Sequence, residues 1–276
     1  MNKIIEIKYI EHIYPDKTRV EICGLEIVVR EGEKIALLGP NGGGKTTIIK
    51  HILGILTTKQ GAIKVFGLDP AKNFDRIRER MGVVLQSIEE QLIGPTVIDD
   101  IIFSPLNFGY SRDQALEMAG KIMLRLEITH LKDKIIHYLS GGEKRKVALA
   151  GALILNPDLL ILDEPFSSLD FRSQKELMQL INEISEEKKI SVVIATHDIE
   201  HVLDFADTVY LISAKEHMIR KGTPEEIFYL DEELDKFHLE KPSLVKIFKG
   251  LKDSGYDLGT PTSTDEAVSL LLHHLK

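Results

Sequence analysis

The sequence has one cysteine, no long apolar run and no excess of basic residues. The single thiol, Cys23, cannot form a disulfide within the chain, which favours a reduced, cytoplasmic setting. A buried structural role for this thiol is favoured over a reactive one. Acidic residues occur too early for a secretory signal peptide, and no apolar run approaches the ~20 residues that span a membrane. We therefore expect a chain that does not cross a membrane but could dock on a protein that does.

Acidic residues outnumber basic ones by 43 to 35, which gives a formal net charge of −8. Binding to nucleic acid needs a basic surface that neutralises phosphates, so this balance argues against nucleic acid as the main partner. A local basic patch could still be hidden in the average. The length of 276 residues, of which 43% are hydrophobic, allows one large domain or a main domain with a smaller appendage.

Short apolar runs and longer amphipathic segments follow one another along the chain. The expected strands cover residues 4–10, 19–29, 34–38, 62–66, 82–85, 159–162, 191–195 and 208–212. The expected helices cover residues 45–56, 112–127 with Ser111 as N-cap, 172–187 and 199–205, and the remainder of 73–156 is mostly helical. Strands that alternate with helices imply parallel pairing through crossover connections. The tail beyond Pro224 is also expected to be helical.

A glycine-rich loop follows the expected strand at residues 34–38 and precedes an expected helix. Glycines let backbone N–H groups converge on the β- and γ-phosphates, a lysine neutralises phosphate charge, and a hydroxyl suits Mg²⁺. The loop therefore predicts binding of a nucleoside triphosphate. It does not predict which process the energy of that nucleotide drives. It satisfies the pattern G-x-x-x-x-G-K-[ST] with Gly39, Pro40, Asn41, Gly42, Gly43, Gly44, Lys45, Thr46 and Thr47.

The segment at residues 139–170 carries two further pieces of phosphate chemistry. Ser140-Gly141-Gly142 opens an expected helix, where a hydroxyl and free backbone N–H groups suit an anion. Asp163 and Glu164 follow the expected strand at residues 159–162. An aspartate at a strand end suits Mg²⁺, and the next carboxylate suits the polarisation of a water for attack on phosphate. The residues alone leave open whether both pieces serve the same nucleotide.

Together these motifs resemble the ATP-binding cassette (ABC) ATPases over nearly the whole chain. The glycine-rich loop is similar to the Walker A motif, and Asp163-Glu164 to the end of Walker B with the catalytic glutamate. Residues 139–143 are similar to the signature sequence, with Glu143 in place of the commoner Gln. The other matches are Tyr14 for an aromatic residue that stacks on adenine, Gln86 for the Q-loop glutamine, residues 167–170 for the D-loop and His197 for the switch histidine.

The resemblance implies a role for each matched residue. Glu164 would be the general base, His197 would contact the γ-phosphate, and Gln86 would contact Mg²⁺ and the attacking water. An ordinary polar strand end for Gln86, a surface histidine at His197 and a turn residue at Tyr14 remain the alternatives. The expected ligands of Mg²⁺ are Thr46, Gln86 and Asp163.

The resemblance also implies an α/β fold of the P-loop NTPase class with a RecA-like core, an N-terminal antiparallel β subdomain and a helical subdomain. The ABC ATPase domain would cover residues 1–225, with the helical subdomain at about 87–156. Residues 226–276 would form a C-terminal helical extension with dimer contacts. In the family, the signature residues Ser140, Gly141 and Gly142 face the nucleotide of the opposite subunit. A C2 dimer of identical or related ATPases would therefore hold two ATP molecules.

A narrower resemblance links residues 86–91, 103–109, 141–151 and 222–227 to the ATPase components of energy-coupling-factor importers, especially the cobalt and nickel branch. It implies a peripheral ATPase on the cytoplasmic face of the cell membrane. Integral membrane and substrate-binding subunits would complete an importer of a trace metal or a vitamin. The rival function is a non-transport ABC ATPase that acts on nucleic acid or on the ribosome. The lack of a heptad insertion and of a second phosphate loop disfavours that rival.

Two groups of polar residues each allow two interpretations. Paired histidines at the end of the tail, His273 and His274, suit a metal site or, more often, a solvated helix end. Four acids flank the groove expected to receive a membrane partner, where they would meet basic residues or form a solvated face. These acids are Glu89, Glu90, Asp99 and Asp100.

Overall fold

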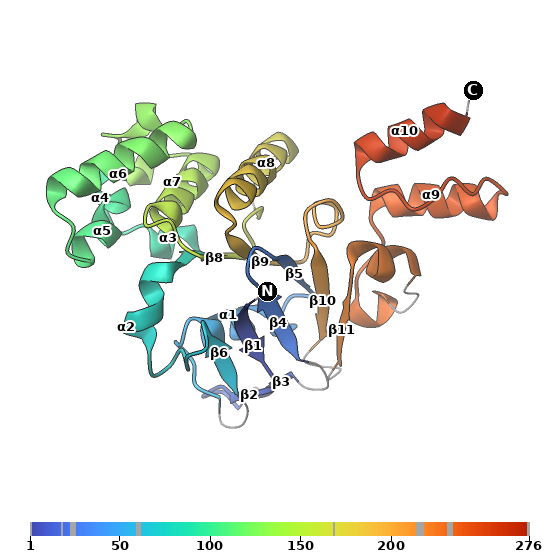
Figure 1. The fold of residues 1–276 in the computed structure, drawn as a ribbon, viewed down its shortest axis with the longest axis horizontal. Coiled ribbons are helices and arrows are strands. Elements are labelled where there is room, and N and C mark those ends of the chain that lie inside the picture. Colours follow the sequence, from blue (N-terminus) through green and yellow to red (C-terminus); the bar gives the residue numbers. More distant parts are fainter. Residues whose placement is uncertain are drawn as a thin grey trace.

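The computed structural model describes residues 2–17, 19–22, 26–58, 62–167, 169–213, 218–230 and 234–274. The predicted structural thiol, Cys23, and one D-loop position, Ser168, lie outside these residues. In Figure 1 a helical region and a C-terminal extension lie at opposite ends of the molecule, on either side of a central sheet. None of the described helices is long and apolar enough to span a membrane.

A six-stranded sheet in the order β11-β10-β5-β9-β8-β7 forms the centre of the fold. Neighbouring strands are parallel, except that β11 pairs antiparallel with β10. Five of these strands were expected, whereas β11 was missed because its sequence, MIRKG, is half polar and lies at the sheet edge. The strands are β5 (Lys34–Leu38), β7 (Met81–Val84), β8 (Leu159–Asp163), β9 (Ser191–Thr196), β10 (Thr208–Ser213) and β11 (Met218–Gly222).

The helices follow the expected order along the chain. The Ser111 side chain caps α6 in a capping box with Gln114, as predicted. Helix α1 ends at Ile52 rather than near residue 56, because Gly54 adopts a left-handed conformation (φ 69°). The helices up to β9 are α1 (Lys45–Ile52), α2 (Phe74–Ile77), α3 (Ile88–Gln91), α4 (Val97–Ile101), α5 (Phe103–Asn107), α6 (Arg112–Arg125), α7 (Gly141–Leu153) and α8 (Phe171–Lys188).

The central sheet is buried on both faces, with one apolar core on each. Successive side chains of a strand point to opposite faces, so Ala36 and Leu38 of β5 belong to one core while Ile35 and Leu37 belong to the other. Helix α8 covers the first face and α1 the second. Continuous apolar runs such as LLIL in β8 are typical of strands that are covered on both sides.

The N-terminal region was expected to contain two long strands and instead contains four short ones. A bend at Lys8 separates β1 (Lys3–Ile7) from β2 (Ile10–Ile13). The sheet β4-β1-β6 and the hairpin β2-β3 are both antiparallel. The expected antiparallel β subdomain is therefore present, although a single bend sends its first segment into two sheets. The remaining strands are β3 (Arg19–Ile22), β4 (Ile27–Arg30) and β6 (Ile63–Val65).

The helix expected at residues 199–205 is wrong, because this segment forms hydrogen-bonded turns. The Asp198 side chain accepts a hydrogen bond from the Glu200 backbone N–H at 3.1 Å, which bends the chain into a turn at the point where the helix was expected to start.

The tail beyond residue 224 packs on the first core through Phe228 and Phe237, both fully buried. It contains a π-helical turn (Glu226–Leu230), a 3₁₀ turn (Leu234–Phe237), α9 (Ser243–Asp253) and α10 (Thr264–His274). The tail is therefore helical, as predicted. The Tyr229 hydroxyl donates to the Pro261 carbonyl at 2.7 Å and ties the two halves of the tail together.

Helix α9 receives its N-terminal cap from a residue distant in sequence. Its own N-cap, Pro242, offers no side-chain acceptor. Instead the Glu200 carboxylate accepts hydrogen bonds from the Ser243 backbone N–H at 3.0 Å and from the Ser243 hydroxyl at 2.9 Å. A carboxylate at this position satisfies free N–H groups and interacts favourably with the helix dipole. The tail is thereby joined to the turn that follows β9.

Replacing this cap should loosen α9. We expect Glu200→Ala to lower the local opening free energy of α9 by on the order of 1 kcal/mol, measured by hydrogen exchange of the amides at residues 243–248. Ser254→Ala, which removes a hydrogen bond to Gly250 at the other end of α9, is the matched control. Equal exchange at residues 243–248 in both variants and in the parent would refute the capping role.

Candidate functional site

The glycine-rich loop lies between β5 and α1, at the carboxyl end of the central strands. A Cβ on Gly39 would lie 2.2 Å from the Ile212 carbonyl oxygen of β10, so only glycine fits there. Gly44 has a φ of 101°, which side-chain-bearing residues rarely adopt. Lys45 is 5% exposed, and its ammonium donates to the carbonyls of Gly39 at 2.8 Å and Pro40 at 3.3 Å. The loop is therefore closed around its own lysine.

Three segments meet the loop at this edge because they follow the neighbouring parallel strands β9, β8 and β7. Leu38 of β5 pairs with Thr196 of β9, and Asp163 of β8 pairs with Ala195. The residues after β7 lead to Gln86, which is placed with Tyr14, Glu164 and the glycine-rich loop around a pocket of about 340 Å³. Ligand sites of open parallel sheets form at the carboxyl ends of their strands. We call this space the P-loop pocket.

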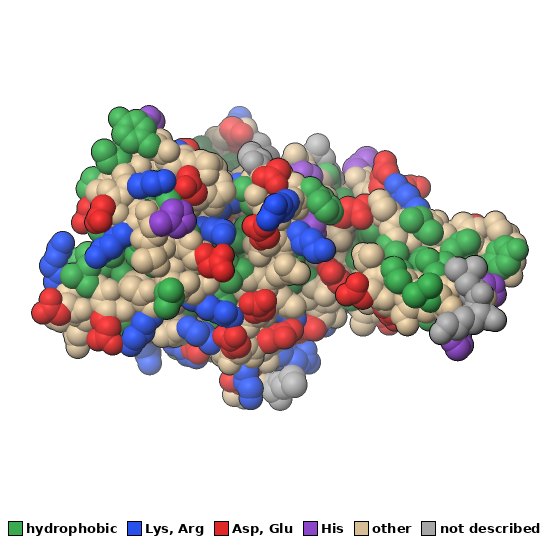
Figure 2. Space-filling model, turned by 90° about the horizontal axis from the view of Figure 1, so that it is seen from above, with side chains coloured by type: hydrophobic (Ala, Val, Ile, Leu, Met, Phe, Trp, Pro, Cys, Tyr) green, Lys and Arg blue, Asp and Glu red, His purple; other side chains and the backbone are tan. Residues whose placement is uncertain are grey.

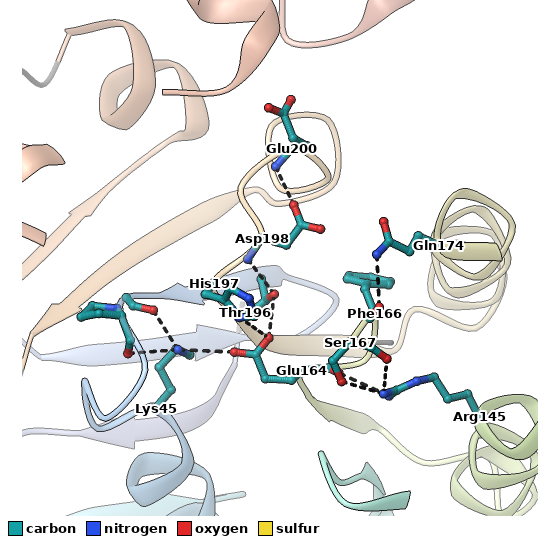
Figure 3. A network of polar contacts seen from close by, with 12 residues as sticks. Lys45, Arg145, Glu164, Phe166, Ser167, Gln174, Thr196, His197, Asp198 and Glu200 are labelled. Atoms are coloured by element: carbon teal, nitrogen blue, oxygen red, sulfur yellow. Dashed lines mark hydrogen bonds and ion pairs between the residues drawn. The ribbon is translucent and has the colours of Figure 1, made fainter. Parts of the chain in front are cut away.

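Glu164 lies at the centre of a polar network (Figure 3). Its side chain is buried, and Oε1 lies 3.4 Å from the Lys45 ammonium. Oε2 accepts a hydrogen bond from the Thr196 hydroxyl at 3.1 Å and lies 2.9 Å from Nδ1 of His197. A cation on one side and two polar groups of the β9 end on the other therefore fix the direction of this carboxylate. The structure brings the predicted base and the predicted switch histidine together.

Asp163 is buried beside Glu164 and lies close to the phosphate loop. Burial raises the pKa of its carboxyl group, and the Thr46 hydroxyl and the Lys45 ammonium partly oppose this shift. Among the described residues, Asp163 Oδ1 and Glu164 Oε1 are buried side-chain oxygens without a hydrogen-bond partner. Such an oxygen normally finds a partner, so Asp163 and the Thr46 hydroxyl are suited to hold a hard cation such as Mg²⁺.

Tyr14 closes one side of the P-loop pocket. Its hydroxyl is 2.9 Å from the Thr47 hydroxyl, and its ring packs edge-on against His12 at a centroid distance of 4.5 Å. His12 in turn packs edge-on against His51 of α1 at 5.3 Å. The aromatic residue is thus held beside the phosphate loop by a hydrogen bond and by a stack of rings. Sequence reasoning found Tyr14 but not the two histidines, since neither stands in a motif.

Ser140, Gly141 and Gly142 do not join the P-loop pocket of their own chain. The Ser140 hydroxyl accepts from the Glu143 N–H at 3.3 Å, and the Glu143 carboxylate accepts from the Ser140 N–H at 2.8 Å, which makes a capping box at the start of α7. Ser140 and Gly142 instead line a separate hollow of about 300 Å³ with Leu169. The two pieces of phosphate chemistry in residues 139–170 therefore open onto different spaces.

Arg145 is a residue of this region to which the sequence analysis gave no role. It lies on α7, is 6% exposed, and donates to the backbone carbonyls of Glu164 and Ser167. In the sequence, the only signal for Arg145 is that a basic residue precedes a mostly apolar helical run, in RKVALAGAL. The next residue, Lys146, is also basic and is not buried, so the sequence alone could not distinguish Arg145 from a surface charge.

Three of the four acids near the expected docking groove already have partners within the chain. Glu89 pairs with Lys144 at 2.5 Å, and Asp99 accepts a hydrogen bond from the Thr96 hydroxyl at 2.5 Å. Asp100 accepts from the backbone N–H groups of residues 93 and 94 at 2.8 and 2.9 Å. Each of these three acids therefore already has a partner within the chain. Within the described residues no group of three or more His, Cys, Asp or Glu side chains is arranged to hold a metal. His273 and His274 are therefore not part of such a group.

The fold and this edge define a P-loop ATPase of the ABC class. A family model described as ABC transporter matches residues 23–167. An ABC transporter ATP-binding protein of Methanopyrus kandleri is 41% identical over 95% of both chains. The energy-coupling factor transporter ATP-binding protein EcfA of Methanothermobacter thermautotrophicus is 34% identical over 99% of this chain and 88% of its own. Among solved structures, cbiO1 of Clostridium perfringens, part of the ABC transporter complex cbiONQ, is 33% identical with a TM-score of 0.75 over 90% of this chain and all of its own.

The chain therefore belongs to the ABC transporter family, in the group of EcfA- and CbiO-like ATP-binding proteins. This confirms the predicted family, the predicted ABC ATPase fold with its parallel core and antiparallel β subdomain, and the predicted activity of an ATPase coupled to transport. ATP is accordingly its nucleotide.

Buried His51 should make stability depend on pH. Neither of its ring nitrogens has a hydrogen-bond partner of normal geometry among the described residues, and burial, with a smaller contribution from His12, lowers its pKa to about 4. Because the folded pKa lies below the unfolded one, the unfolded chain takes up the proton first. The stability present above pH ~6.5 is then lost as the pH falls towards 4.

We expect His51→Leu to remove about 2 kcal/mol of the stability loss between pH 7 and 5, measured by urea unfolding at each pH. His130→Leu is the matched control, since His130 is exposed. A parent and a His51→Leu variant with the same pH slope would contradict a neutral, buried His51.

Proposed function

We propose that this chain is the ATP-hydrolysing subunit that powers an energy-coupling-factor type importer of a trace metal ion (cobalt or nickel) or a vitamin. The observation that carries the ATPase chemistry is the buried Glu164 carboxylate, held between the Lys45 ammonium and the end of β9. The observation that carries the transport role is the likeness over nearly the full chain to EcfA and to cbiO1.

The P-loop pocket would hold the triphosphate of ATP. The Lys45 ammonium now donates to two carbonyls of its own loop, and the phosphate oxygens of ATP would replace these acceptors. Tyr14 would stack on the adenine. The backbone N–H groups of the loop would converge on the β- and γ-phosphates. The residues with this binding role are Tyr14, Gly39, Pro40, Asn41, Gly42, Gly43, Gly44, Lys45, Thr46 and Thr47.

Mg²⁺ would be held by three oxygen-bearing side chains at this edge, and it would neutralise charge on the β- and γ-phosphates. The buried, unpartnered Oδ1 of Asp163 and the neighbouring Thr46 hydroxyl support this assignment. Gln86 lines the same pocket from the end of β7 and would supply its amide oxygen. The ligand set is Thr46, Gln86 and Asp163.

Glu164 would act as the general base of hydrolysis. Once phosphate takes over the Lys45 ammonium, Oε1 of Glu164 is left facing the P-loop pocket, where it can accept a proton from the attacking water. The Thr196 hydroxyl donates to Oε2, so the free oxygen keeps its direction when His197 turns away. His197 is half exposed and would turn from Glu164 to the γ-phosphate when ATP enters.

Each catalytic site would be completed by a second ATPase subunit, identical or related. Ser140 and Gly142 line a hollow separate from the P-loop pocket, and Gly141 lies exposed between them. The Ser140 hydroxyl accepts from the Glu143 N–H in the first turn of α7. A C2 dimer would place this helix end over the γ-phosphate held by the partner chain. Two composite sites would then enclose two ATP molecules.

The C-terminal extension, residues 226–276, would add dimer contacts outside an ATPase domain of residues 1–225 with its helical subdomain at about 87–156. Figure 2 shows hydrophobic side chains gathered at the end of the molecule that the extension forms. Ile247, Val268 and Leu272 are about half exposed there, at 57%, 49% and 56%. Leu275, near the end of the extension, lies outside the described residues.

Integral membrane subunits and a substrate-binding subunit would complete the transporter, with this chain bound at the cytoplasmic face of the membrane. The solved relative cbiO1 is described as part of the complex cbiONQ, which supports such an assembly. Purification of the native complex, followed by metal analysis and mass spectrometry of bound small molecules, identifies the substrate. Recovery with ribosomes or nucleic acid in place of membrane subunits would overturn the transport role.

Removing the proposed base should stop turnover without preventing ATP binding. We expect Glu164→Gln to lower kcat by about 100-fold or more, since a neutral amide cannot accept the proton. ATP should then remain bound and stabilise the dimer, measured by light scattering with and without ATP. Glu117→Gln, an exposed change on α6, is the control. Wild-type turnover in Glu164→Gln would show that another group is the base.

Completion of the site in trans can be tested by complementation. Dimers of Lys45→Ala alone or of Ser140→Arg alone have no intact composite site. A mixed dimer keeps one, built from Lys45 of one chain and Ser140 of the other. We expect purified mixed dimers to hydrolyse ATP at least about tenfold faster than either parent. Mixed dimers no faster than the parents would mean that Ser140 does not act on the partner's nucleotide.

A further inference from the structure

Arg145 joins α7, the helix that begins at the signature residues, to the turn that carries Glu164. One guanidinium nitrogen donates to the Glu164 carbonyl at 3.3 Å. The other donates to the Ser167 carbonyl at 2.5 Å and to the Ser167 hydroxyl at 2.7 Å (Figure 3). The donor lies on α7, and all three acceptors lie in the turn that follows β8. A planar guanidinium with a fixed fork of donors can serve several acceptors at once.

The turn that receives these bonds holds Glu164 in a demanding backbone conformation. Glu164 has a φ of 48°, in the left-handed region, which costs a residue with a side chain roughly 1–2 kcal/mol. Its carbonyl also accepts from the Ser167 N–H at 3.2 Å and from the Ser167 hydroxyl at 3.1 Å. Its own N–H donates to the Ala195 carbonyl at 2.8 Å. Such a conformation persists only where the surrounding contacts hold it.

This backbone conformation determines where the Glu164 side chain points. With it, the carboxylate reaches the Lys45 ammonium and the end of β9. Arg145 does not touch the carboxylate oxygens, because its described acceptors are backbone carbonyls and the Ser167 hydroxyl. Arg145 is nevertheless almost fully buried, with 6% of the residue exposed, and burial is the main cause that lowers its pKa. A buried charge is retained at such a cost only with good partners.

The same arginine is rigidly connected to the signature residues. Ser140 caps the helix that carries Arg145, five residues further along, which is about 7–8 Å along the helix axis. Leu169 lies 3.8 Å from where a Cβ on Gly142 would be, so the D-loop also packs on the start of α7. A displacement of the helix start by a nucleotide would therefore reach the Glu164 turn through Arg145.

We propose that Arg145 is a positioning residue that ties α7, whose start faces the partner's nucleotide, to the turn that aims Glu164 at the chain's own nucleotide. This inference rests on the proposed function, in which the signature residues act in trans. Engagement of α7 by one ATP molecule then sets the base for hydrolysis of the other. The two sites of a dimer are thereby coupled through one side chain in each subunit.

The test uses Arg145→Gln, Arg145→Lys and Ser167→Ala in the full chain, with the exposed change Lys121→Gln on α6 as control. We expect Arg145→Gln to lower kcat about tenfold or more while the Kd for ATP stays within about twofold. The Hill coefficient for ATP, above one when two sites interact, should fall to one. Arg145→Lys should restore part of kcat, since an ammonium can reach one carbonyl. Ser167→Ala should show a smaller loss of the same kind.

Mixed dimers separate positioning in cis from a general defect. In the dimer of Lys45→Ala and Ser140→Arg chains, the working site uses Glu164 of the Ser140→Arg chain. In that chain α7 begins at the Ser140→Arg change and faces the Lys45→Ala loop, so the turnover reports only how Arg145 holds the Glu164 turn. Arg145→Gln added to that chain should lower this turnover further, whereas the same change in the Lys45→Ala chain should leave it unchanged. Equal losses from both placements, or a wild-type kcat and Hill coefficient in Arg145→Gln, overturn the proposal.

Failure of the proposed function has a different signature. If the mixed dimers show no complementation in the first place, the trans arrangement is wrong whatever Arg145 does. If they complement and Arg145→Gln still behaves as the parent, only the coupling role is wrong. Should Arg145→Gln not fold, as judged by its thermal unfolding, Arg145→Lys and Ser167→Ala carry the same comparison of kcat, Kd and Hill coefficient.

Discussion

The direction of one buried carboxylate is the constraint on which the active edge of this ATPase depends. Glu164 lies just beyond a strand that is covered on both faces, in a left-handed conformation. Lys45 reaches it from the phosphate loop, Thr196 and His197 from β9, and Arg145 holds its backbone from α7. These contacts come from three separate parts of the chain, so the carboxylate is aimed only when the sheet and the helical region are packed together.

The parallel sheet explains why these elements meet. Since β5, β9 and β8 are in register, their carboxyl ends form one edge, and the residue after each strand contributes to it. The alternating apolar residues of these strands supply a core on each face, which leaves the edge as the place where polar groups gather. The C-terminal extension is attached to this same edge, because Glu200, three residues beyond His197, caps α9.

Much of the site could be predicted because its residues stand in local patterns with a direct chemical meaning. The run from Gly39 to Thr47 predicts its own loop, and Asp163-Glu164 after an apolar strand predicts an acidic strand end. Arg145, His12 and His51 could not be found in this way, since their roles depend on contacts 19 to 39 residues distant in the chain. The turns at residues 199–205 and the edge strand β11 were missed because a side-chain hydrogen bond and strand pairing outweighed the apolar pattern.

The sequence by itself determined the class of chemistry, because a phosphate loop, an acidic strand end and a signature turn each need particular residue types at short spacing. It also determined the layered fold, since strand and helix periods are local properties of the chain. Only the tertiary structure decided which of these pieces share a space. Ser140 and Glu164 stand 24 positions apart in one segment, yet they line different hollows, because Ser140 caps α7, which packs on β7, whereas Glu164 follows β8. Long-range packing of this kind has no signature in any short stretch of sequence.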